Sequence, residues 1–119
     1  MIYVANAFSL QMLEGDDMAI RVQTIPKGGV EHALREASYS DGWTSAVGHA
    51  DTANVISDDL RMEVPHNRIN LTLRPGDVLY VGQLVGGRLP EGTTTLPEGF
   101  RLVWKRVSAY AVEDSNAPA

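Results

Sequence analysis

Short runs of hydrophobic residues along the chain predict five β-strands. Residues 2–7 form an apolar run rich in β-branched and aromatic side chains, which is typical of a buried strand. Residues 78–85 are almost continuously apolar, and this pattern predicts a central strand that is buried on both faces. Elsewhere apolar and polar residues alternate, as expected for strands with one buried face. The alternating runs cover residues 18–25, 69–73 and 102–112.

Helical signals lie between these strands. Ser9 is a suitable N-cap for a brief helix over residues 10–13, because its hydroxyl can accept a hydrogen bond from a free N–H group of the first turn. Between Val30 and Ser38 good helix formers are frequent, so we expect a helix or helical turn there. The Pro-Lys-Gly-Gly segment at 26–29 ends the preceding strand.

Two further helical segments are predicted on either side of a glycine and a histidine. Ser40 or Asp41 could cap the first segment, and Gly48 would close it. The second segment would begin soon afterwards, capped by Asp51 or Thr52. Its inward face would carry Ala53, Ile56 and Leu60, which are spaced for one side of a helix.

The alternation of strands and helices, with a β-hairpin in the second half, predicts the α/β class. We expect a single domain over residues 1–114, with a mixed β-sheet of about five strands and helices packed on it. The Gly-, Thr- and Pro-rich connection over residues 86–101 is long for a compact domain, and it is therefore a candidate binding loop. Residues 115–119 are polar and contain proline, so we expect a disordered tail.

Composition excludes several kinds of site. The chain of 119 residues contains no cysteine, which excludes disulfides, thiolate zinc sites and a cysteine nucleophile. No apolar run approaches the ~18 residues that a membrane-spanning helix needs, and the N-terminus lacks the features of a secretory signal. We therefore expect a soluble protein without a membrane partner, located in the cytoplasm, which is that of the host cell if a virus encodes it.

Charge narrows the range of partners. The formal net charge of −5 opposes binding along long nucleic acids, because that mode requires a broad basic surface. The first 60 residues carry three basic and nine acidic side chains, whereas the remaining residues carry seven basic and six acidic ones. A small polyanion could therefore bind locally in the second half, among Arg68, Arg88, Arg101, Lys105 and Arg106.

His49 is the leading candidate for chemistry, because it lies where one predicted helical segment ends and the next begins. Backbone N–H groups at a helix N-terminus favour a phosphate. Taken together, the block around His49 and the blocks at 3–9 and 83–92 indicate a nuclease-like phosphodiester site. RNA supplies its own nucleophile, the ribose 2′-OH, so that cleavage requires no metal. Arg88 could grip two phosphate oxygens and His49 could protonate the departing oxygen, while Glu91 could hold either side chain in register.

Five blocks of the sequence, in this order, resemble the viral type III anti-CRISPR ring nucleases, a family with relatives in bacteria and mobile elements. The blocks are Tyr3–Leu13, Gly48–Thr52, Asn67-Arg68, Leu79–Gln83 and Arg88–Gly92. Together they span nearly the whole chain. The resemblance implies a homodimeric α/β protein that binds cyclic tetra-adenylate, the second messenger of type III CRISPR defence, across the dimer interface.

The resemblance also implies a reaction and assigns residues to it. Cleavage in the family is metal-independent and leaves linear di-adenylates with a cyclic phosphate end, so we expect neither a metal nor a cofactor. By motif, the catalytic histidine of the family corresponds to His49, the phosphate-binding arginine to Arg88 and the supporting glutamate to Glu91. A serine near the ligand corresponds to Ser9. The remaining candidate ligand-binding residues are Asn6, Gly48, Arg68, Gln83 and Gly87.

Two segments depart from the family pattern. Relatives carry a helix between the glutamate and the last strand, whereas residues 93–100 of this chain predict a shortened or absent helix. The stretch over residues 28–38 is also longer than expected. Both differences would reshape the lid over the ligand.

Other interpretations remain open. A non-catalytic sponge would bind the signalling ring and sequester it without turnover, and an interaction protein would use the acidic first half to contact another protein. Trp43 and Trp104 suit packing in the core or at a dimer interface better than stacking on adenines. His32 is expected to be exposed, and His66, beside Pro65, is expected in a loop.

Overall fold

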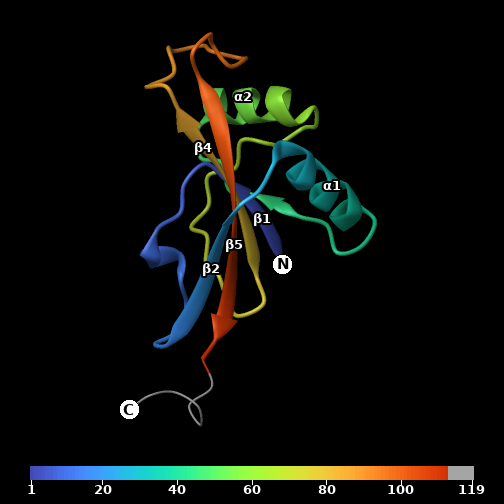
Figure 1. Ribbon diagram of the computed structural model, residues 1–119, viewed down its shortest axis with the longest axis vertical. Coiled ribbons are helices and arrows are strands. Elements are labelled where there is room, and N and C mark those ends of the chain that lie inside the picture. The colour runs from blue at the N-terminus through green and yellow to red at the C-terminus, as the bar shows by residue number, and fades with distance from the viewer. Residues whose placement is uncertain (113–119) are drawn as a thin grey trace.

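Five strands form the single sheet of this protein, whose computed structural model describes residues 1–112 (Figure 1). The strands are β1 (Ile2–Ala5), β2 (Met18–Thr24), β3 (Thr44–Ser45), β4 (Val78–Val85) and β5 (Arg101–Ala111). Their order in the sheet is β2-β5-β4-β1-β3. β1 pairs in parallel with β3 and β4, whereas β5 pairs antiparallel with β2 and β4. The predicted mixed sheet is confirmed, and β4 is its central strand, as its continuous apolar run predicted.

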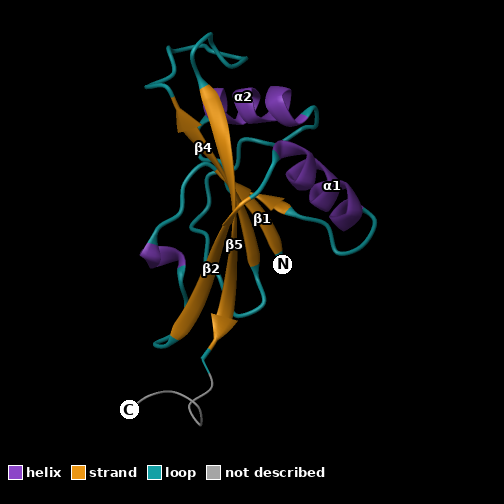
Figure 2. Cartoon of the chain, viewed as in Figure 1, coloured by secondary structure: helices purple, strands orange, loops and turns teal. Residues whose placement is uncertain are grey.

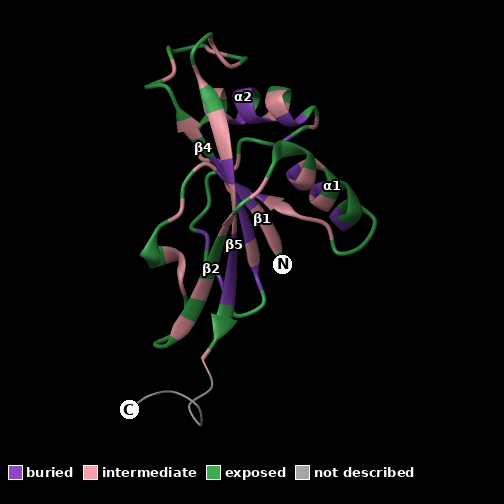
Figure 3. Cartoon of the chain, viewed as in Figure 1, coloured by how far each residue is buried: buried purple, intermediate pink, exposed green. Residues whose placement is uncertain are grey.

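Two α-helices, α1 (Lys27–Ser38) and α2 (Ala50–Leu60), pack on one face of the sheet (Figure 2). Their buried side chains, including Leu34 and Ile56, form a cluster with Val4, Tyr80 and Trp104 of the sheet. Figure 3 shows the buried residues of both helices facing the sheet, with the exposed residues on the outside. The predicted α/β class is therefore confirmed, and Trp104 is a core residue.

Irregular chain rather than α-helix covers the opposite face of the sheet. The short 3-10 helix η1 (Leu10–Met12) begins after Ser9, whose hydroxyl oxygen accepts a hydrogen bond from the Gln11 N–H at 3.2 Å, as its predicted N-cap role requires. Met12, Leu71 and Leu73 pack in the apolar cluster on this face. The two faces thus have separate cores, and α2 belongs to the first.

The alternating segment at 69–73 is not the strand that its pattern predicted. In the part of the chain that the structure describes, it joins other strand-like chain only through an isolated bridge between Leu13 and Leu73. The Leu73 N–H donates to the Met12 carbonyl at 2.6 Å. The alternation instead reflects burial, because Leu71 and Leu73 point into the second apolar cluster.

The helix predicted to close at Gly48 is wrong, because this part of the chain forms the edge strand β3. β3 lies in parallel register with Tyr3 and Val4 of β1, and the Ala46 N–H donates to the Val4 carbonyl at 2.7 Å. These partners are distant in the sequence. Their hydrogen bonds override the weak local preference for a helix.

Other predicted elements agree with the structure. The helix predicted from Val30 begins earlier, at Lys27, with Pro26 in the N-cap position. Within the described chain the connection from β4 to β5 contains no helix, as the composition of residues 93–100 predicted. None of the helices in residues 1–112 is both long and apolar enough to cross a membrane. The predicted tail at 115–119 lies outside the described residues.

Candidate phosphate-binding site

The carboxyl ends of three parallel strands meet at one edge of the sheet. In open α/β sheets, ligands bind at this edge, where loops leave the strands. From β3 the chain runs to His49, and from β4 it runs to Arg88. The last pair between β1 and β4 joins Ala5 to Val81, so β4 continues beyond the end of β1. Because β4 is longer at this end, the connection that follows it begins beyond the end of β1.

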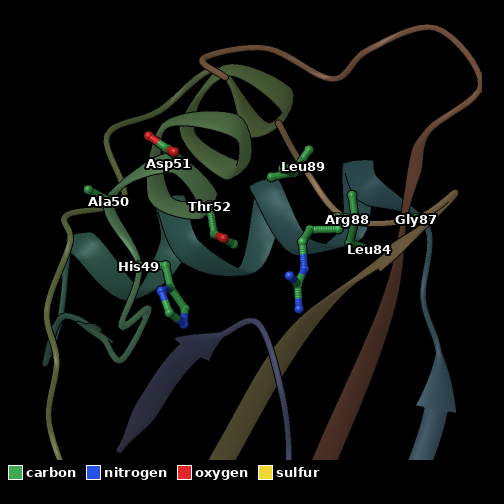
Figure 4. Close-up of a pocket in the computed structure, with 8 residues that line it drawn as sticks. All are labelled: His49, Ala50, Asp51, Thr52, Leu84, Gly87, Arg88 and Leu89. Carbon is green, nitrogen blue, oxygen red and sulfur yellow. The ribbon is translucent and has the colours of Figure 1, made fainter. Parts of the chain in front are cut away.

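A cavity of about 690 Å³ lies at this edge, a size within the range of small-molecule sites. It is formed by the first turn of α2 and by the chain at the end of β4. Figure 4 shows the His49 ring and the Arg88 guanidinium directed into the same space, with the Thr52 hydroxyl between them in this view. The lining residues are His49, Ala50, Asp51, Thr52, Leu84, Gly87, Arg88 and Leu89.

The N-terminal turn of α2 lines this cavity. The helix begins at Ala50, and His49 is its N-cap, with extended backbone angles of φ −123° and ψ 130°. The prediction that Asp51 or Thr52 would be the cap is therefore wrong, because both residues lie within the first turn. Among the described residues no side chain caps this end at the His49 position. The N–H groups of the first turn thus remain suited to an anion.

A neighbouring segment clasps the chain just before His49. The Asn67 side-chain amide donates to the Ser45 carbonyl at 2.7 Å, and the Asn67 N–H donates to the Val47 carbonyl at 2.8 Å. His66 Nε2 lies 3.1 Å from the Gly48 carbonyl oxygen. These contacts hold the path from β3 into α2. This role of His66 and Asn67 was not predicted from the sequence, although the Asn67-Arg68 block marked the segment.

Two glycines shape the chain that carries Arg88. Gly86 and Gly87 have φ angles of +128° and +129°, a conformation that other residues rarely adopt. A Cβ on Gly86 would approach the Gly99 carbonyl oxygen and the Phe100 Cα to 2.9 Å. The absence of a side chain at Gly86 therefore lets the two ends of this connection come into close contact. Gly87 itself lines the cavity.

The other predicted ligand-binding residues, and the predicted supporting residue Glu91, are not among the lining residues of this cavity. The Arg68 side chain packs against Gly48, since its Cγ would be 3.6 Å from a Cβ built on that glycine. Asn6 follows β1 at the same edge and is half-buried. Gln83 is exposed on the overhanging part of β4, on the same face as Val81 and therefore on the face opposite to the lining residue Leu84. Glu91 is exposed in the connection after Arg88.

Ser9 is placed elsewhere within the chain. It lines a smaller cavity of about 330 Å³ together with residues of the 69–72 segment, and it caps η1. The structure of one chain therefore does not bring Ser9 to His49.

Several basic residues of the second half are engaged away from the cavity. Lys105 Nζ donates to the Thr24 hydroxyl at 2.6 Å, and Arg106 donates to the Ser108 hydroxyl at 2.8 Å. Arg74 also lies outside the lining residues, and the hydrogen bond that it donates to the Glu14 carboxylate raises the pKa of its guanidinium. In residues 1–112 no three side chains of the ligating types gather closely enough to hold a metal ion.

The fold and the cavity define a small α/β protein with a candidate anion-binding site at the carboxyl edge of its sheet. The chain belongs to the STIV B116-like family, whose sequence model matches residues 2–102. It is 32% identical over 92 residues to uncharacterized protein 26 of Sulfolobus islandicus filamentous virus (isolate Iceland/Hveragerdi), covering 77% of this chain and 74% of the relative. It is also 32% identical over 90 residues to uncharacterized protein ORF116 of Acidianus filamentous virus 1 (isolate United States/Yellowstone), covering 76% and 73%.

A solved structure agrees with this assignment. B116 of Sulfolobus turreted icosahedral virus (STIV) superimposes with a TM-score of 0.77 at 21% sequence identity, over 90% of this chain and 97% of that protein. The similarity shows the same α/β fold. The relatives found are thus proteins of archaeal viruses.

Proposed function

We propose that this protein is a metal-independent ring nuclease that binds cyclic tetra-adenylate and cleaves it to linear di-adenylates, which would switch off type III CRISPR signalling. The observation that carries the proposal is the shared cavity of His49 and Arg88, which are far apart in the sequence. The resemblance of the sequence blocks to ring nucleases supplies the identity of the ligand. Membership of a family with viral relatives is in keeping with a protein that suppresses host defence.

The proposed reaction uses the ribose as nucleophile. The 2′-oxygen attacks the adjacent phosphorus while the bond from phosphorus to the 5′-oxygen breaks in line with it, which forms the cyclic phosphate end. His49 donates a proton to the departing 5′-oxygen, and the 2′-OH proton leaves to solvent. Arg88 and the first-turn N–H groups of α2 stabilise the negative charge that builds on the phosphoryl oxygens.

The symmetry of the ligand favours a homodimer. A ring of four equivalent nucleotides has a two-fold axis, so two copies of the cavity can grip it equivalently and attack opposite linkages. In the proposed complex each of the two cavities, of about 690 Å³, holds one half of the ring. Arg68, which packs against Gly48, and Asn6, at the end of β1, are available there for further ligand contacts, and Glu91 supports Arg88.

The test is a chromatographic assay of excess cyclic tetra-adenylate in EDTA. The wild-type protein should produce linear di-adenylates over many turnovers. His49→Ala should lower the rate by about 10²–10⁴-fold, the usual contribution of a positioned acid, while ring binding is retained. His32→Ala, which removes an exposed histidine on α1, is the matched control and should leave turnover unchanged.

Other outcomes would replace the proposal. Stoichiometric protection of the ring without product would identify a sponge. Absence of any nucleotide binding by the wild-type protein would overturn the proposal and favour an interaction protein that uses the acidic first half of the chain.

A further inference from the structure

Asp51 is an unexpected lining residue in a cavity that also holds an imidazole and a guanidinium. A carboxylate in such a place would repel a phosphate through its charge. The structure gives this carboxylate a specific partner, because Asp51 Oδ2 accepts a hydrogen bond from the Gly92 N–H at 2.9 Å. The contact joins the first turn of α2 to the long connection that carries Arg88.

The connection presents Gly92 in a defined turn. The Thr93 N–H donates to the Pro90 carbonyl at 3.2 Å, and the Thr93 hydroxyl also donates to that carbonyl. Gly92 occupies the third position of this turn with φ +81°, which is the angle that a type II turn requires and that glycine adopts readily. The turn thus orients the Gly92 N–H toward α2, only a few residues beyond Arg88.

The position of Asp51 in α2 also favours this hydrogen bond. Asp51 lies in the first helical turn, where the partial positive charge of the helix N-terminus stabilises a carboxylate. The side chain is half-buried, and its hydrogen bond crosses from the helix to a loop distant in sequence. Hence one side chain ties the two halves of the cavity wall together.

We propose that Asp51 is a positioning residue that latches the Pro90–Thr93 turn onto α2 and thereby holds Arg88 over the cavity. The consequence for turnover rests on the proposed function, whereas the latch itself does not. The latch and simple charge repulsion predict opposite effects of removing the Asp51 carboxylate on phosphate affinity. Removal of a repelling carboxylate should tighten phosphate binding, but removal of the latch should weaken it.

The latch can be tested without any ligand by limited trypsin digestion, because Arg88–Leu89 is a tryptic bond within the connection. Asp51→Ala should speed cleavage at this bond about fivefold, the change expected from the loss of one hydrogen bond. Asp51→Asn keeps an acceptor oxygen without the charge, and should cleave at close to the wild-type rate. Asp58→Ala removes an exposed carboxylate at the other end of α2 and serves as the matched control.

Gly92→Ala gives an independent variant that leaves Asp51 intact. A Cβ at this position meets no atom within 4 Å, so the substitution acts only through the unfavourable positive φ. It should also speed cleavage at Arg88. Equal cleavage rates for the wild type, Asp51→Ala and Gly92→Ala would overturn the latch.

Steady-state kinetics with cyclic tetra-adenylate then connect the latch to Arg88. Asp51→Ala should raise KM about fivefold, with a smaller fall in kcat, and Asp51→Asn should restore KM. A lower KM for Asp51→Ala would show that the carboxylate acts by repulsion and would overturn the positioning role. An inactive wild-type protein with normal latch behaviour in the trypsin assay would instead refute the proposed function alone.

Discussion

His49 and Arg88 are both exposed, so backbone geometry rather than side-chain packing determines where they lie. His49 is placed by its N-cap position on α2, and Arg88 by the pair of glycines that precedes it. Exposed polar side chains on a rigid frame are typical of functional sites. Both residues were candidates from the sequence, but their meeting in one cavity depends on elements that lie far apart in the chain.

Replacement of Arg88 should separate charge from geometry. Arg88→Ala should lower kcat/KM for cyclic tetra-adenylate by about 10- to 100-fold, as expected for a lost hydrogen bond to a charged group. Arg88→Lys should recover only part of this loss, because an ammonium group cannot grip two phosphate oxygens in a planar fork. Initial rates at several ring concentrations would measure both effects. Arg21→Ala, on the exposed part of β2, should match the wild type, and full activity of Arg88→Ala would exclude its proposed role.

At the scale of elements, the short chain segment from β3 into α2 positions His49. β3 contains two residues, and its position depends on pairing with β1 and on the clasp from residues 65–67. The Ser45 hydroxyl contributes by donating to the Pro65 carbonyl at 2.6 Å. A strand this short has little local preference of its own, which is why its sequence suggested a helix.

Loss of the clasp should affect both stability and turnover. Asn67→Ala removes the amide that donates to the Ser45 carbonyl, and should lower the free energy of unfolding by about 1–3 kcal/mol. The rate should also fall, since His49 follows the clasped segment. Urea denaturation and the ring-cleavage assay would measure the two effects. Asn70→Ala, which alters an exposed amide, should change neither, and an unchanged Asn67→Ala protein would contradict the clasp.

The pairing of Gly82 in β4 with Trp104 in β5 offers a purely steric prediction. A Cβ on Gly82 would lie 2.7 Å from Trp104 Cη2, so Gly82→Ala must displace the buried indole and should cost about 1–3 kcal/mol of stability. Gly28→Ala is the contrasting control in α1, where no atom lies within 4 Å of the new Cβ. It should stabilise the protein by about 0.4–1 kcal/mol by restricting the unfolded chain. Thermal or urea unfolding would measure the change in stability of each variant. Changes of the same sign for Gly82→Ala and Gly28→Ala would contradict the steric explanation.

At the scale of the whole molecule, the sheet separates two apolar clusters of different construction. The helices cover one face, whereas η1 and the 69–73 segment cover the other. The cavity lies on the edge of the helical face, where α2 meets the overhang of β4. This placement leaves the cavity open to solvent in one chain, which suits a ligand shared between two chains.

The stoichiometry of ring binding tests the proposed homodimer. Titration of the His49→Ala protein with cyclic tetra-adenylate should give one ring per two chains, because each chain would contact half of a two-fold symmetric ligand. Light scattering should give twice the mass of one chain, and calorimetry would supply the stoichiometry. A ratio of one ring per chain, or a monomer in both measurements, would contradict the shared site.

Local patterns by themselves determined most of the elements. β1 and β4 were predicted from continuous apolar runs, β2 and β5 from alternation, and α2 from the spacing of its buried face, because these signals are contained in consecutive residues. The long connection without a helix was also apparent from its composition. The same reasoning misplaced the N-cap of α2, since the signals of adjacent polar residues are nearly equivalent.

Only the tertiary structure decided where these pieces meet. β3 exists because β1 offers it a parallel partner, and the 69–73 segment stays irregular because its leucines are buried beside η1. The shared cavity of His49 and Arg88 arises from three parallel strands that end at one edge. Hydrogen bonds and packing between distant segments set these features, and no local pattern contains them.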